Sequence, residues 1–227
     1  MFWPRSLLTA LCGLSAACAL AQPGVAVPPP ADRGTAGFFA VVTRIDHRTA
    51  QQMRGVSWKR GCPVPIRDLR TIRMTHRGFD GRVHWGQLVV HEDVAPRVVR
   101  VFRKMYASGF PIRRMKRIER YGGSDDRSMA ADNTSAFNCR PVTGSPGRFS
   151  VHSYGKAIDI NTIENPYVNG NTVLPAAGRR YLDRGNVRRG MIVRGGKVTR
   201  AFRKAGFDWG GNWTSLKDYQ HFEIPIG

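Results

Sequence analysis

The sequence predicts an α+β fold in which an antiparallel sheet is flanked by helices. Residues 69–75 and 83–90 have the composition of two strands, and the Asp-Gly turn within 78–81 joins them as a hairpin. Apolar residues then recur at helical spacing over 98–106, after Asp93 as a candidate N-cap. Because hairpins and helices do not alternate regularly, the pattern favours an antiparallel sheet over a parallel one.

The second half of the chain predicts shorter elements of both kinds. Residues 175–182 and 198–205 have helical character, and Gly206 is the candidate C-cap of the second helix. Residues 157–161 and 221–224 are strand-rich. We therefore expect one domain, over residues 37–227, that contains both sets of elements.

The N-terminal region predicts export. Residues 1–21 have a basic start, an apolar run and the small-residue pattern Ala-Leu-Ala, which is typical of a cleaved signal peptide. The apolar run is too short to favour a permanent membrane span. Residues 22–36 are rich in Pro and Ala and predict an extended tether. We expect a secreted or cell-envelope protein, with lipoprotein anchoring at Cys18 as the alternative.

Two cysteines, Cys62 and Cys139, lie outside the predicted signal peptide. In a chain exported to an oxidising compartment, such a pair is expected to form a disulfide. Closing a loop of this length stabilises a fold by about 4 to 5 kcal/mol in the chain-entropy model. The alternative is that both are buried free thiols.

The chain is strongly basic, with 36 Lys and Arg against 16 Asp and Glu and a net charge of +20. Such a surface attracts polyanions. The basic residues are scattered and show no dense run, so nucleic acid is a weaker candidate than the anionic polymers of a cell wall. A solvated basic surface without a dedicated partner is the alternative.

The residues that carry chemistry lie in two short segments, 150–159 and 218–223. A catalytic zinc takes three protein ligands of N or O type and keeps a fourth position for water. His152, Asp159 and His221 supply such a set. A nearby carboxylate outside the set, for which Asp218 is placed, can move the proton of the attacking water.

This assignment makes a structural demand and leaves one rival. On a straight strand, His152 and Asp159 would point to different faces, so the chain must turn at Gly155 to bring them together. Glu223 shares a strand face with His221 and is the rival base.

The motifs that resemble a known family are Ser-x-His-x-x-Gly-x-Ala-x-Asp at 150–159, Trp-Gly-Gly-Asn-Trp at 209–213 and Asp-x-x-His-Phe at 218–222. With these motifs, residues 133–223 resemble the zinc D-Ala-D-Ala carboxypeptidases. That family includes VanY-type carboxypeptidases and L-alanyl-D-glutamate endopeptidases and shares the hedgehog/D,D-peptidase fold. The first half of the domain carries no comparable signature.

The resemblance implies one zinc ion held by His152, Asp159 and His221, with Asp218 as general base and acid. It also implies that Arg140 binds the substrate carboxylate or the oxyanion, for which the rigid fork of a guanidinium is suited. Some relatives have Glu at the position of Asp218, so the resemblance does not identify which peptide bond this protein cleaves.

The two tryptophans of the second motif, Trp209 and Trp213, are expected either to line a substrate groove or to pack in the core. Their position beside a Gly-Gly turn is compatible with both environments.

We therefore expect a monomeric, secreted zinc metallopeptidase that hydrolyses peptide bonds in peptidoglycan stem peptides, as a D,D-carboxypeptidase or an endopeptidase. Its partners would be stem peptides and anionic wall polymers, with no specific nucleic acid. The alternative is a catalytically silent cell-wall or polyanion-binding module that retains the zinc site. A purely structural zinc would need a fourth protein ligand, for which Cys139 is the candidate.

Overall fold

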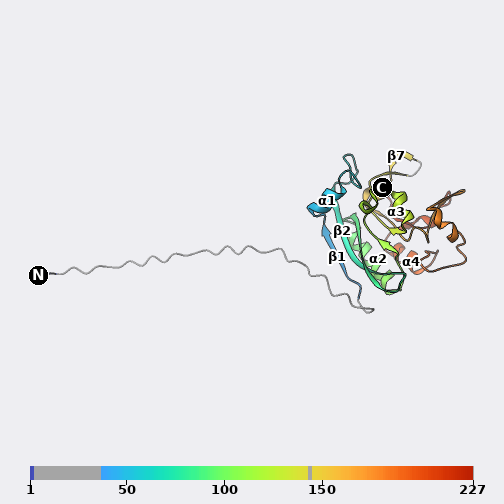
Figure 1. Ribbon diagram of the computed structural model, residues 1–227, viewed down its shortest axis with the longest axis horizontal. Helices are drawn as coiled ribbons and strands as arrows, with labels where there is room; N and C mark the ends of the chain where they lie inside the picture. The colour runs from blue at the N-terminus through green and yellow to red at the C-terminus, as the bar shows by residue number, and fades with distance from the viewer. Residues whose placement is uncertain (3–36, 143–144, 227) are drawn as a thin grey trace. The chain divides into compact units, whose positions relative to one another are not determined.

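The computed structural model describes residues 1–2, 37–142 and 145–226, and it combines short helices with mostly antiparallel sheets (Figure 1). The fold class is therefore α+β, as the sequence predicts. The predicted signal peptide beyond Phe2 lies outside the described residues, as do Cys18 and the predicted tether. Within the described residues, no helix has the length and apolar composition needed to cross a bilayer.

The first sheet contains the hairpin predicted around the Asp-Gly turn. Its strands lie in the order β1 (Ala40–Arg44), β2 (Leu69–Arg77) and β3 (Val83–His91), and neighbouring strands are antiparallel. In the turn between β2 and β3, Gly81 has a φ of 78°, a conformation that glycine adopts without a Cβ clash. The turn aligns the two strands, which pair along their whole length.

The helix α2 (Ala95–Ala107) packs between β2 and a second helix, α4 (Lys197–Lys204) (Figure 1). Its apolar face, with Val98, Phe102 and Met105, is buried in the main hydrophobic core. This burial explains the helical spacing of apolar residues in the sequence.

Two details of the predicted helices differ from the structure. The helix α2 begins after Val94, which occupies the N-cap position, so the predicted cap Asp93 lies one residue too early and no side chain caps the helix. Residues 175–182, predicted as a short helix, contain the tighter 3₁₀ helix η4 (Ala176–Tyr181).

A second sheet carries the site motifs. Its strands lie in the order β11 (Asp208–Trp209), β13 (His221–Glu223) and β8 (Ala157–Asp159), again antiparallel. The register places His221 directly opposite Asp159. Two segments that are about 60 residues apart in sequence therefore meet through strand pairing, which brings both predicted motifs to one edge of the core.

Shorter elements complete the described fold. Further strands are β4 (Arg114–Met115), β5 (Asn133–Thr134), β6 (Pro141–Val142), β7 (Ser145–Phe149), β9 (Tyr167–Asn169), β10 (Thr172–Leu174) and β12 (Lys217–Asp218). Further helices are α1 (His47–Met53), α3 (Asp125–Ala130) and the 3₁₀ helices η1 (Ile66–Asp68), η2 (Ile118–Tyr121), η3 (Val151–Tyr154) and η5 (Gly210–Asn212). The strands β10, β9 and β12 form a third sheet, β6 pairs with β7, and β4 runs parallel to β5.

Cys62 and Cys139 form the expected disulfide, with their Cα atoms 6.0 Å apart and 77 positions between them in sequence. The bond belongs to a second core cluster that includes Met53, Leu69 and Phe137. This cross-link ties the chain just before Arg140 to the N-terminal part of the domain.

Candidate metal centre and active site

The first two candidate ligands approach each other because the chain turns between them. The Ser150 hydroxyl accepts a hydrogen bond from His152 N at 3.3 Å and caps the short helix η3. Gly155 then ends η3 with a φ of 66° and directs the chain into β8. A Cβ at Gly155 would lie 2.6 Å from His91 N, so a larger residue would clash with β3. The turn that the metal-site hypothesis demands is therefore present.

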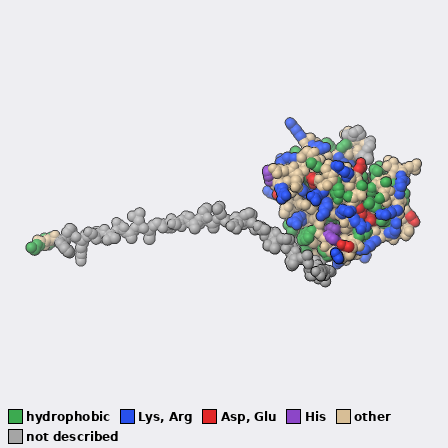
Figure 2. Space-filling model, viewed as in Figure 1, with side chains coloured by type: hydrophobic (Ala, Val, Ile, Leu, Met, Phe, Trp, Pro, Cys, Tyr) green, Lys and Arg blue, Asp and Glu red, His purple; other side chains and the backbone are tan. Residues whose placement is uncertain are grey.

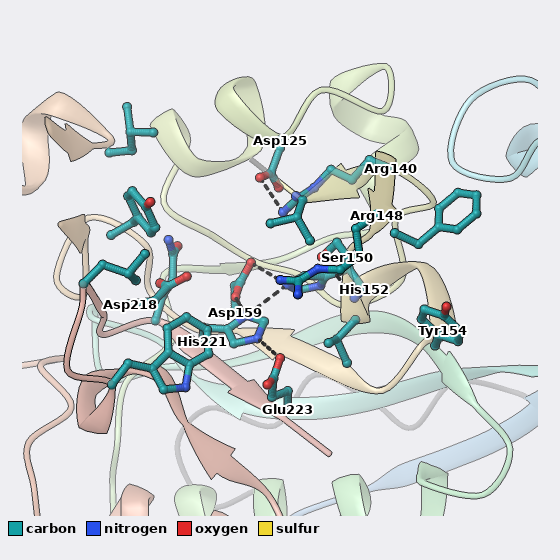
Figure 3. A pocket seen from close by; sticks show the side chains of 18 of the residues that line it. Asp125, Arg140, Arg148, Ser150, His152, Tyr154, Asp159, Asp218, His221 and Glu223 are labelled. Atoms are coloured by element: carbon teal, nitrogen blue, oxygen red, sulfur yellow. Dashed lines mark hydrogen bonds and ion pairs between the residues drawn. The ribbon is translucent and has the colours of Figure 1, made fainter. Parts of the chain in front are cut away.

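The third candidate ligand arrives from the neighbouring strand. His221 Nδ1 lies 3.0 Å from Asp159 Oδ1 and 3.2 Å from His152 Nε2. Asp159 Oδ2 lies 3.1 Å from the same nitrogen of His152. The three residues are 3%, 4% and 6% exposed in chain order, so the cluster is shielded from bulk solvent. Figure 3 shows the three side chains pointing toward one another.

Each imidazole has one nitrogen engaged outside the cluster, which leaves the other facing inward. His152 Nδ1 lies 2.6 Å from the carbonyl oxygen of Ala136, to which it donates, so Nε2 is the nitrogen that faces the cluster. His221 Nε2 lies 2.9 Å from Glu223 Oε2, so its inward nitrogen is Nδ1. A carboxylate or carbonyl behind an imidazole is the usual arrangement at metal-binding histidines.

The electrostatics of the metal-free cluster favour a bound cation. Burial opposes ionisation of Asp159, but the charges and hydrogen bonds of His152 and His221 outweigh it and hold the Asp159 pKa below its usual range. Burial would lower the pKa of His221, yet hydrogen bonds to Asp159 and Glu223 raise it to about 10. A raised pKa favours a proton on His221, so the site favours a positive charge between its acidic groups. A metal ion can take the place of the His221 proton.

The donor set fits a catalytic zinc. One donor atom from each of His152, Asp159 and His221 lies within 4.8 Å of the other two. Tetrahedral bonds of 2.0–2.1 Å place neighbouring donors about 3.3 Å apart, close to the 3.0–3.2 Å separations found here. Among the described residues, the group has no fourth His, Cys, Asp or Glu, and the disulfide removes Cys139 as a ligand. The arrangement matches an open site more closely than a closed structural one.

Asp218 lies beside the cluster without joining it. It ends β12, and its Oδ1 atom is buried and has no hydrogen-bond partner among the residues that the structure describes. Burial raises the pKa of Asp218 to about 7, although the charge of His221 opposes this rise. A carboxyl group whose pKa is near neutral can both accept and donate a proton. Its rival, Glu223, is already bonded to the outer nitrogen of His221.

A cavity of about 690 Å³ opens onto the cluster, and charged, polar and apolar residues line it. Arg140 lines it and forms an ion pair with Asp125, with 2.7 Å between Nη2 and Oδ2. The Ser153 hydroxyl accepts a hydrogen bond from Arg140 N at 2.9 Å and donates one to Arg140 O at 2.8 Å. The backbone of Arg140 is thereby held against η3, the helix that carries His152.

The two candidate tryptophans have different environments. Trp213 lines the cavity, and its ring centroid lies 5.4 Å from that of His221. Trp209 is buried in the main core, where its ring stacks on Phe222 and its Nε1–H donates to the Tyr219 carbonyl. Trp209 does not line this cavity, and a role for it in substrate binding stays a prediction.

Residues 143–224 match the family model described as D-alanyl-D-alanine carboxypeptidase. This part of the chain is similar to that peptidase family. No solved structure matches the chain. The matched segment contains all three candidate ligands and Asp218, and Arg140 lies just before it. The protein is a metallopeptidase of the D-Ala-D-Ala carboxypeptidase type, and its family together with its disulfide indicates an extracytoplasmic location.

Sequence reasoning gave Glu223 a different role and missed Asp125 and Arg148 in this site. Glu223 orients a candidate ligand, Asp125 pairs with Arg140, and Arg148 lines the cavity. Only Glu223 had a sequence signal, since it lies two positions after His221 on the same strand face. The other two come from segments whose approach to the site depends on the tertiary fold.

Proposed function

We propose that the protein is a secreted zinc peptidase that hydrolyses peptide bonds in peptidoglycan stem peptides. One observation carries the proposal most directly: two oriented imidazoles and a carboxylate converge beside Asp218 in a cavity of about 690 Å³, and Asp218 Oδ1 has no partner in the described part of the chain. The family match supports the substrate class. The predicted signal peptide supports export.

In this proposal, His152, Asp159 and His221 hold the zinc. When bound, the ion supplies a Lewis acid for the scissile carbonyl and for the attacking water. The hydrogen bonds from His152 to Ala136 and from His221 to Glu223 keep the two rings in one tautomer and one orientation. The two contacts leave one nitrogen of each ring directed at the cluster.

Asp218 moves the proton. It accepts a proton from the attacking water and then delivers it to the leaving amine, so the bond between carbonyl carbon and nitrogen breaks as an amine and a carboxylate form. The near-neutral pKa of Asp218 suits both steps. Its unpartnered oxygen leaves one position free for the proton.

Arg140 stabilises negative charge on the substrate. A guanidinium keeps its charge and presents paired N–H donors, so it can bind a carboxylate or a developing oxyanion. Asp125 and Ser153 hold the side chain and the backbone of Arg140, respectively. The disulfide at Cys139 restrains the same segment.

The basic surface would concentrate the enzyme on its polymer. Figure 2 shows Lys and Arg side chains spread over the visible face rather than gathered in one patch. A general field of this kind attracts anionic wall polymers and weakens as salt screens it. We propose adsorption to the wall by this field, with cleavage confined to the cavity.

The experiment is to incubate the mature chain, metal-free and zinc-loaded, with defined muropeptides and to identify the products by mass. Loss of a terminal D-Ala indicates a carboxypeptidase, and a split stem indicates an endopeptidase. We expect Asp218→Asn to lower kcat by about 10²- to 10⁴-fold without loss of zinc. Asp93→Asn, which removes the same charge at an exposed position, is the control. Intact muropeptides with zinc-loaded protein would contradict the proposed function.

A further inference from the structure

The hairpin of β6 and β7 presents two arginines to the same cavity. Pro141 pairs with Phe149, and Ser150 N donates to Arg140 O at 3.0 Å, so Arg140 lies opposite Ser150. Side chains alternate along a strand, so Arg148 shares a face with Ser150 and hence with Arg140. Both arginines line the cavity that opens onto the metal cluster.

The two guanidinium groups differ in how their charge is balanced. Arg140 is paired with Asp125 and also donates to the Pro141 carbonyl at 3.3 Å. Arg148 is exposed and has no hydrogen bond or ion pair with another described residue. The hairpin side of the cavity therefore carries one positive charge in excess of its acidic partner. A substrate anion is the natural partner for such a charge.

Arg148 lines the same cavity as His152 and His221, so its guanidinium and the metal cluster border one space. In the view of Figure 3, Arg140 and Arg148 lie on one side of the cluster and Asp218 on the other. A peptide whose scissile bond lies at the cluster would therefore pass beside Arg140 and Arg148 on the hairpin side of the cavity.

We propose that Arg148 binds a free carboxylate of the substrate and selects peptides that present one on the hairpin side of the cluster. The inference rests on the proposed peptidase function. A guanidinium can hold a carboxylate through two parallel hydrogen bonds and stays charged at any physiological pH. Arg140, already held by Asp125, is then a fixed second donor rather than the group that distinguishes substrates.

The test compares two stem peptides that differ only at the C-terminus, one ending in a free D-Ala carboxylate and one in the amide. KM, kcat and equilibrium binding of both peptides are measured for the parent, Arg148→Gln and Arg148→Lys. Arg100→Gln is the matched control, because Arg100 is an exposed arginine on α2 that does not line the cavity. Thermal melting verifies that each variant is folded.

We expect Arg148→Gln to weaken binding of the free carboxylate, and to raise its KM, by roughly 10- to 100-fold. Its effect on the amide should be small, Arg148→Lys should restore part of the loss, and Arg100→Gln should change neither peptide. Equal losses on both peptides, or no loss, would overturn the role of Arg148. If the parent cleaves neither peptide, the peptidase function fails, while the binding measurements still decide whether Arg148 recognises the carboxylate.

Discussion

Glu223 holds the outer nitrogen of His221, and its removal tests whether that ring is oriented for a metal. The Nε2–Oε2 distance is 2.9 Å, and the Glu223 side chain is only 20% exposed. A hydrogen bond to a charged group contributes about 1.5–3 kcal/mol, which corresponds to roughly 10- to 150-fold in affinity. Loss of such an outer partner typically weakens metal binding by about 10- to 100-fold. We therefore expect Glu223→Ala to raise the zinc Kd by one to two orders of magnitude.

The assay is competition between the metal-free protein and a chromogenic chelator. Glu223→Gln keeps an acceptor oxygen without the charge, so its zinc affinity should lie between those of the parent and Glu223→Ala. Asp93→Asn, with the same loss of one negative charge at an exposed site, should bind zinc like the parent. A folded Glu223→Ala protein with parental zinc affinity would refute the argument that this carboxylate orients His221.

Three further predictions follow from the site and its supports. For the zinc-loaded enzyme, kcat/KM should fall as the pH drops below about 7, because burial raises the pKa of Asp218 and only its ionised form accepts a proton. A bound cation would move this midpoint downward, and Asp218→Asn should lack the acidic limb altogether. Replacing both Cys62 and Cys139 with Ala should lower the free energy of unfolding in urea by up to about 4.5 kcal/mol, as the chain-entropy model gives for a separation of 77; an unchanged midpoint would contradict it. Arg140→Ala should reduce kcat/KM at least about tenfold, and parental turnover would exclude the proposed role.

Local patterns predicted the parts of the fold that depend on local chemistry. The Asp-Gly turn predicted the hairpin of β2 and β3, and the apolar spacing predicted α2. The need for a turn at Gly155 also followed from the residues alone, because strand alternation separates the faces of His152 and Asp159. The meeting of these two residues with His221 could not follow from spacing, since it depends on the pairing of β8 with β13.

The sequence could not decide which of two possible contacts or environments a side chain has in the folded protein. Asp93 was the expected helix cap, but the helix begins one residue later than that role requires, and the Asp93 carboxylate lies beside His91. Glu223 was a rival base by its strand position, and only the tertiary structure shows it bonded to His221. Trp209 could have faced either a groove or the core, and the stacking of its ring on a buried phenylalanine decides for the core.

Because β8 pairs with β13, the candidate metal ligands and the hairpins that border the cavity belong to different structural elements. All three donor atoms come from these strands and the turn before them, whereas the hairpins β6–β7 and β9–β10 only border the cavity. We expect that changes within those hairpins would leave the three donor residues in place. Variants changed in this way should keep their metal while acquiring a new peptide preference, so the scaffold is suited to engineering enzymes that cut different bacterial walls.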